Sequence, residues 1–195
     1  VTDDGFPLTP GFPELSWNKF SGPGEVEFFQ PNALQTTARF SEAGIYILRL
    51  TANDGEAETS SDVTVAVEPE TFPSWSELHF TLLEQSNPEI SRPMADPDMD
   101  GFTNAEEFIA GTNPRDSQSF LRFDSAVQSI PGTVTLKVHV PERRSYSILQ
   151  SDDPVNNGWT KLQDISALLT PQTYELQDSS TNSSRFYRIV APAQP

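Results

Sequence analysis

The chain has 195 residues, 28 of them acidic and 12 basic, which gives a formal net charge of −16, and it has no cysteine. The lack of cysteine excludes disulfides and thiol chemistry. Most of the acidic excess lies in residues 1–119, which argues against nucleic acid or an anionic membrane as a partner, because both need a basic face. No apolar run is long enough to cross a bilayer, so we expect no membrane insertion.

Residues 1–70 predict a small antiparallel β-sandwich. Turns rich in Gly, Pro, Asn and Asp separate short strand-like runs, and this spacing is typical of sandwiches. The predicted strands are residues 15–20, 25–29, 35–40, 44–52 and 61–67. We interpret Trp17 as a core residue of this sandwich rather than as an exposed platform that stacks on a sugar.

The acidic residues of this region define a second candidate cation site. Asp3, Asp4, Asp54, Glu56 and Asp62 could gather at one end of the sandwich. Turn residues whose side chains hydrogen-bond to their own backbone explain the same positions about as well, so both interpretations stay open.

Two segments of this region carry a family resemblance. Residues 17–26 read WNKFSGPGEV and residues 36–56 read TTARFSEAGIYILRLTANDGE. Together they resemble the PKD and REJ-type immunoglobulin-like modules of surface proteins. The resemblance implies an immunoglobulin-like sandwich whose first strand is cut off. The opening residues, VTDDG, read as the middle of a domain, so we expect a piece of a longer protein.

Residues 75–85 predict a short amphipathic helix. Ser74 and Glu77 have the spacing of a capping box, and apolar residues follow at helical intervals. We expect the helix to end near Pro88, with about eight irregular residues before Asp96. The residues predicted to face inward are Trp75, Leu78, His79, Leu82 and Leu83. Because His79 lies on this apolar face of the helix, we interpret it as a packing residue rather than a catalytic base.

Residues 96–107 match the twelve-residue calcium-loop pattern D-x-[DN]-x-[DN]-G-x5-E at every position. The pattern brings four carboxylates to one point, where they repel one another unless a hard cation neutralises them. Magnesium fits less well, because it requires a small octahedral shell and retains water. The alternative, a solvated acidic turn, does not account for the number of matched positions. The predicted calcium ligands are the side chains of Asp96, Asp98, Asp100 and Glu107, the Phe102 carbonyl oxygen and, directly or through water, Asn104.

The flanks of this loop differ from those of a paired EF-hand. The entering helix does not run into the loop, and the sequence holds only one such loop. After the loop, residues 103–110 predict a helix with Phe108 and Ile109 inward and Gly111 as its C-terminal cap. We therefore expect a structural calcium staple rather than a sensor.

Residues 95–114 read ADPDMDGFTNAEEFIAGTNP. They resemble the thrombospondin type 3-like, EF-hand-like calcium repeats of secreted planctomycete and verrucomicrobial proteins. That family has a small residue where Met99 stands and Asp where Asn113 stands, and neither departure removes a main ligand. The resemblance implies a bound Ca²⁺ and an extracellular location.

Residues 120–195 predict a second β-sandwich. The candidate strands are residues 120–125, 132–140, 144–150, 160–165, 172–176 and 185–190, and residues 133–140 alternate with period two. Residues 146–153, 158–162 and 185–190 resemble the fibronectin type III-like domain that ends many of the same bacterial proteins. We interpret Trp159 as a core residue and His139 as a solvated strand residue.

The predicted fold is mainly β, with two antiparallel β-sandwiches (1–70 and 120–195) joined by a helical calcium-binding connector (71–119). No metal-hydrolase or Ser/His/Asp constellation is recognisable, which favours a non-catalytic role. We expect an accessory region of a secreted or cell-surface protein that attaches to a polysaccharide or a cell-surface glycan, with neighbouring domains as partners. A passive calcium-rigidified spacer is the alternative. A hydrolase is the third interpretation, because 28 acidic residues always include carboxylate pairs.

Overall fold

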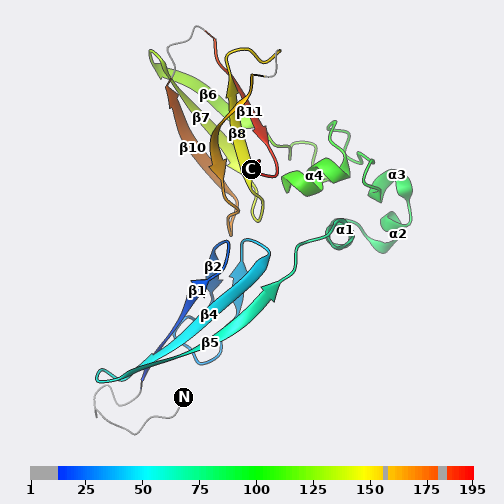
Figure 1. Cartoon of the computed structure of the whole chain (residues 1–195). Helices are drawn as coiled ribbons and strands as arrows, with labels where there is room; N and C mark the ends of the chain where they lie inside the picture. The colour runs from blue at the N-terminus through cyan, green and yellow to red at the C-terminus, as the bar shows by residue number, and fades with distance from the viewer. Residues whose placement is uncertain (1–12, 156–157, 180–183) are drawn as a thin grey trace. The chain divides into compact units, whose positions relative to one another are not determined.

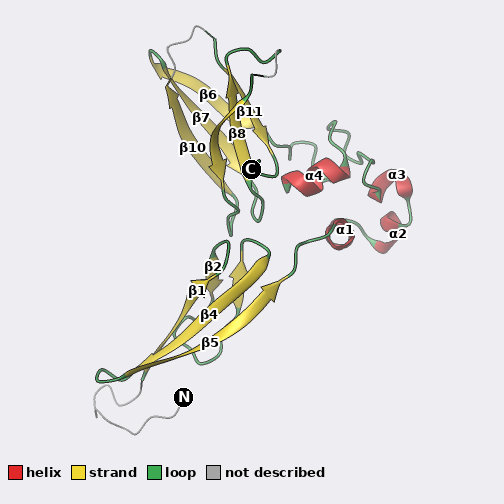
Figure 2. Ribbon diagram, viewed as in Figure 1, coloured by secondary structure: helices red, strands yellow, loops and turns green. Residues whose placement is uncertain are grey.

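The computed structural model describes residues 13–155, 158–179 and 184–195, and it is mainly β. Two β regions of antiparallel sheets are separated by a short helical segment, residues 72–110, as Figures 1 and 2 show. The chain forms two compact units, Val1–Pro69 and Glu70–Pro195. The predicted fold class is therefore confirmed, whereas the three-part division at residues 70 and 119 stays a prediction.

The N-terminal β region consists of a three-stranded and a two-stranded antiparallel sheet. In the first, β4 (Gly44–Asn53) lies between β1 (Glu14–Ser21) and β5 (Glu58–Val67). In the second, β2 (Val26–Phe28) pairs with β3 (Ala38–Phe40). All five strands overlap predicted ones, because turn residues mark their ends in the sequence.

The packing of the N-terminal β region centres on Tyr46, which is fully buried. Its hydroxyl donates to the Glu42 carbonyl oxygen at 2.8 Å. Gly22 lies against its ring, and a Cβ there would approach the Tyr46 Cδ1 atom to 2.3 Å. Trp17 is half-buried, stacks on Phe28 at 6.2 Å between ring centroids, and donates its indole N–H to the backbone. The Trp17 ring thus packs within this region but, contrary to the prediction, is not one of its buried core residues.

The predicted single helix over residues 75–85 is wrong, because the chain forms two short helices there and a third in the stretch before Asp96 that was expected to be irregular. They are α1 (Phe72–His79), α2 (Leu82–Gln85) and α3 (Pro88–Ser91). Thr71 and Ser74 form the capping box of α1, in place of the predicted Ser74 and Glu77. Phe80 is extended at φ −123° and ψ 137°, and Thr81 starts α2 with a new capping box. The local Thr81 cap therefore outweighs the apolar periodicity.

The break at Phe80 changes which apolar residues are buried. Trp75 and Phe80 are buried, and Trp75 packs edge-on against Phe108 at 5.8 Å between ring centroids. The predicted inward orientation is wrong for Leu78 (77% exposed), Leu82 (86%) and Leu83 (81%), and Ile109 is 43% exposed. The helical segment thus packs through aromatic rings.

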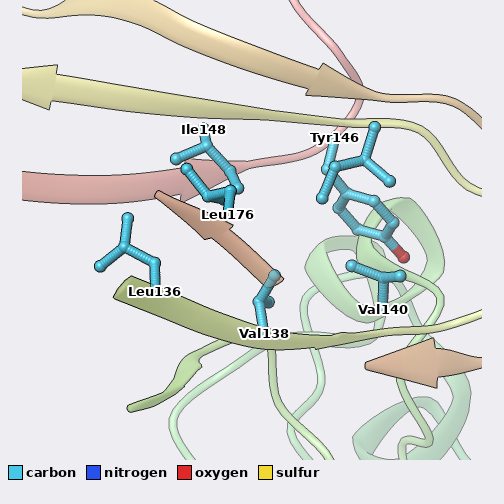
Figure 3. Packing of buried hydrophobic residues seen from close by; sticks show 7 residues of the cluster. Leu136, Val138, Val140, Tyr146, Ile148 and Leu176 are labelled. Carbon is cyan, nitrogen blue, oxygen red and sulfur yellow. The ribbon is translucent and has the colours of Figure 1, made fainter. Parts of the chain in front are cut away.

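The C-terminal β region has two three-stranded antiparallel sheets. One has β7 (Thr133–Val140) between β6 (Phe123–Ile130) and β10 (Gln172–Ser179); the other has β8 (Tyr146–Ser151) between β9 (Thr160–Ile165) and β11 (Phe186–Val190). Both sheets contribute to one buried cluster (Figure 3), made of Leu136, Val138, Val140, Tyr146, Ile148, Ile165 and Leu176.

The period-two prediction for β7 is confirmed. Leu136, Val138 and Val140 are fully buried, whereas Lys137 and His139 alternate with them and are exposed. Trp159 is half-buried beneath the Arg188 guanidinium, which lies 4.8 Å from the ring centroid. It therefore packs at the edge of this region rather than in the central cluster.

Candidate metal site

Three aspartates in the loop before α4 (Asn104–Ala110) converge on one point. One carboxylate oxygen from each of Asp96, Asp98 and Asp100 lies within 4.8 Å of the others. The loop backbone holds the second oxygen of each. Gly101 N–H donates to Asp96 Oδ2 at 3.0 Å, Asp100 N–H to Asp98 Oδ1 at 3.3 Å, and Phe102 N–H to Asp100 Oδ1 at 2.8 Å. The loop backbone therefore orients all three carboxylates.

Positive backbone φ angles make this convergence possible. Gly101 has φ 97° and Met99 has φ 60°. Nothing lies within 4 Å of a Cβ built on Gly101, so glycine is needed there for its backbone conformation rather than for space. The sharp turn that the sequence pattern requires at the sixth loop position is thus present.

Helix α4, which follows the aspartate loop directly, carries two oxygen-bearing side chains on its buried face. Thr103 caps the helix, and Glu106 Oε2 accepts both its N–H and its hydroxyl at 2.8 Å. Asn104 (0% exposed) and Glu107 (1%) lie three residues apart, so they share one face of the helix. The charges of the three aspartates act on Glu107, so this face of α4 lies beside the converging carboxylates.

Asn104 is oriented by two backbone carbonyls. Its Nδ2 donates to the Ile90 and Arg92 carbonyl oxygens, both at 2.8 Å. Asn104 N–H also donates to the Ala95 carbonyl oxygen at 2.8 Å, which ties the start of the loop to its end. With both amide hydrogens committed, only Oδ1 remains for a ligand.

Five buried oxygens of this pocket have no hydrogen-bond partner. Buried polar atoms are nearly always paired, and an unpaired one costs about 1–3 kcal/mol. Here the orphaned atoms come from loop positions 1, 3, 5, 9 and 12 of one short segment. They are Asp96 Oδ1, Asp98 Oδ2, Asp100 Oδ2, Asn104 Oδ1 and Glu107 Oε2.

The pocket is electrostatically unfavourable without a cation. Burial, followed by the charges of Asp98 and Asp100, raises the pKa of Glu107 to about 8, and the Thr112 hydroxyl only partly offsets this. Burial and the neighbouring Asp100 and Asp96 carboxylates also raise the pKa of Asp98, although the Asp100 N–H opposes this. A divalent cation would remove both penalties.

The set of oxygens suits a hard divalent cation. All the orphaned atoms are oxygens, the atom type that such cations take as ligands. The roles of the Phe102 carbonyl as a ligand and of a water at Asn104 stay predictions.

Residues of the C-terminal β region hold the end of α4. Arg144 Nε donates to the Phe108 carbonyl oxygen at 2.9 Å, and the Tyr146 hydroxyl donates to the Ala110 carbonyl oxygen at 2.8 Å. Arg144 also pairs with Glu70 at 2.6 Å. In Figure 3 the Tyr146 hydroxyl points away from the aliphatic cluster, toward the helical segment. The helix that carries Glu107 is thus fixed at both ends.

We expect Tyr146→Phe to lower the free energy of unfolding of the Glu70–Pro195 unit by about 1–3 kcal/mol, because it leaves the Ala110 carbonyl without its donor. Chemical denaturation measures this loss. Tyr174→Phe is the matched control, since its hydroxyl contacts Gln163 at the surface of the same β region. Equal losses in the two variants would contradict a specific role for the Tyr146 hydroxyl.

Arg144 and Tyr146 were not predicted from the sequence as supports of the site. Both lie 36 residues from the carbonyls that they contact, and no local pattern connects them. Thr112, whose hydroxyl donates to Glu107 Oε1 at 3.3 Å, was also missed. Its position directly after the predicted cap Gly111 was the available signal.

The second candidate cation site stays a prediction, because Asp3 and Asp4 lie outside the described residues. Asp54 Oδ1 accepts the backbone N–H groups of Glu56 and Ala57. Asp62 forms a two-point ion pair with Arg49, which holds the pKa of its carboxyl low. Asp54 and Asp62 therefore have turn and ion-pair partners, whereas the loop carboxylates each keep an orphaned oxygen.

No protein-family model matches the chain, and no solved structure matches it. Over the part of the chain that the structure describes, no helix is both long and apolar enough to cross a membrane.

Proposed function

We propose that this chain is a non-catalytic, calcium-binding accessory region of a secreted or cell-surface protein. The observation that carries the proposal is the set of five buried, unpartnered oxygens at the ligand positions of one twelve-residue loop. A solvated acidic turn would leave such atoms in water, and a hydrogen-bonded structural turn would pair them.

The contacts around the site support a stapling role for the metal. Asn104 connects the pocket to the carbonyls of Ile90 and Arg92, and Glu107 connects it to α4. The end of α4 is bonded to Arg144 and Tyr146. A bound Ca²⁺ would therefore hold the helical segment against the C-terminal β region.

The N-terminal β region supports the resemblance to immunoglobulin-like modules. Its three-stranded sheet has a central strand, β4, that begins just before Tyr46. The Tyr46 hydroxyl bonds to a carbonyl four residues upstream, as in the tyrosine corner of immunoglobulin-like sandwiches. Such modules are common in surface proteins, and attachment to a polysaccharide or cell-surface glycan is the partner we propose.

Two measurements test this proposal. Isothermal titration calorimetry of the metal-free protein with CaCl₂ should give one binding event, and absence of binding would contradict the metal site. A glycan array probed in calcium and in EDTA then tests attachment. Binding to a defined glycan class supports it, whereas calcium binding without any glycan signal would favour the spacer.

A further inference from the structure

The turn that ends α4 places Thr112 beside the metal-site carboxylate. Gly111 is left-handed at φ 74°, and the Glu107 carbonyl oxygen accepts the N–H groups of both Gly111 (2.7 Å) and Thr112 (3.1 Å). A Cβ on Gly111 would come within 2.8 Å of the Arg144 Cγ atom, so the turn also fits closely against the C-terminal β region. The backbone position of Thr112 is thereby fixed relative to Glu107.

This placement gives the Glu107 carboxylate one hydrogen-bond donor among the described residues. The Thr112 hydroxyl donates to Oε1 at 3.3 Å, while Oε2 has no partner. Both side chains are buried, with Thr112 7% and Glu107 1% exposed. The terminal torsion of a glutamate is broad, so without this bond the carboxylate could rotate about its last bond.

We propose that Thr112 is a positioning residue that sets the rotation of the Glu107 carboxylate and thereby favours calcium over magnesium. This inference rests on the proposed metal site. Calcium accepts a carboxylate through both oxygens, whereas magnesium requires octahedral geometry and takes fewer protein oxygens. Oε1 keeps a second lone pair beside its bond from Thr112, so a carboxylate held in one plane by this bond can still present both oxygens to calcium. The bond also resists rotation to a one-oxygen mode.

The test compares the affinities for calcium and for magnesium in Thr112→Val, which keeps the side-chain shape and removes the hydroxyl. Loss of a hydrogen bond that orients a metal ligand typically weakens binding 10–100-fold. Calorimetric titration with CaCl₂ should show a loss of about this size, and titration with MgCl₂ a smaller one. The ratio of calcium affinity to magnesium affinity should therefore fall, and Thr112→Ser should restore it.

Thr51→Val in the N-terminal β region is the matched control, and it should leave both affinities unchanged. Unchanged calcium affinity in Thr112→Val would overturn the inference. Equal losses of calcium and magnesium affinity, together with a lower melting temperature of the variant in EDTA, would also overturn it. That result would show that Thr112 acts through packing alone. Thr112→Ala supplies the same comparison if the valine variant does not fold. If the wild-type chain binds no calcium, the proposed site itself fails, which is a distinct result.

Discussion

Glu107→Gln is expected to destabilise the Glu70–Pro195 unit in calcium and to leave it equally or more stable in EDTA at pH 8. In calcium the variant loses a charged ligand and with it the stabilisation by binding, which is about 2.7 kcal/mol at a metal concentration of 100 times Kd. In EDTA the amide replaces a buried carboxyl whose pKa burial and the aspartates raise to about 8. Thermal unfolding under both conditions measures the two effects.

The control for this prediction is Glu77→Gln, which makes the same chemical change at an exposed position of α1. It should not alter the difference between the melting temperatures in calcium and in EDTA. Equal destabilisation of Glu107→Gln in calcium and in EDTA would show that Glu107 acts through packing or hydrogen bonding instead of through a metal.

In EDTA, the Glu70–Pro195 unit is expected to lose stability as the pH rises from 5 to 8.5. The pKa of Glu107 is raised from 4.5 to about 8 in the folded protein. Between these values the folded state holds a proton that the unfolded state has released, so the free energy of unfolding falls with rising pH. The full shift corresponds to an upper limit of about 5 kcal/mol.

The carboxyl of Asp98 contributes in the same direction, since its pKa is also raised. Glu84 and Glu106 have lowered pKa values, because backbone and side-chain donors stabilise their charged forms. The stability that Glu84 and Glu106 contribute is lost only as the pH falls below the pKa values of these carboxyls in the unfolded state. Their contribution therefore does not vary between pH 5 and 8.5. His79 lies in the same unit, and burial lowers its pKa from 6.5. Its contribution to stability rises with pH only up to about 6.5 and is constant above that value, so denaturation curves between about pH 7 and 8.5 report on the metal pocket.

Calcium should abolish the loss at high pH, because it binds the charged form of Glu107. Glu107→Gln should flatten the profile in EDTA, which makes it the control for the assignment. A wild-type stability in EDTA that stays constant or increases between about pH 7 and 8.5, above the range in which His79 titrates, would contradict the electrostatic description of the pocket.

Features that depend on neighbouring residues were predictable from the sequence. The convergence of Asp96, Asp98 and Asp100 is one, because these residues and the turn at Gly101 lie within one short segment. Strand β7 is another, since alternate apolar residues identify its buried face. In both, the local pattern and the folded structure agree.

Features set by competition between signals were not predictable. Apolar periodicity favoured one helix through Phe80, but the Thr81 capping box ended it and left Leu82 exposed. The contacts of Arg144 and Tyr146 with α4 depend on how the segments pack in three dimensions. Periodicity does not contain that information.

The hydrogen bonds that hold the last turn of α4 also set an order of events during synthesis. A ribosome makes the loop and α4 before it makes Arg144 and Tyr146, whose donors satisfy the carbonyls of Phe108 and Ala110. Until those residues emerge, the last turn of α4 lacks its tertiary support, and a helix of seven residues is too short to persist alone. During synthesis from the N-terminus, the supports of the acidic pocket are therefore complete only after the first strands of the C-terminal β region have been made.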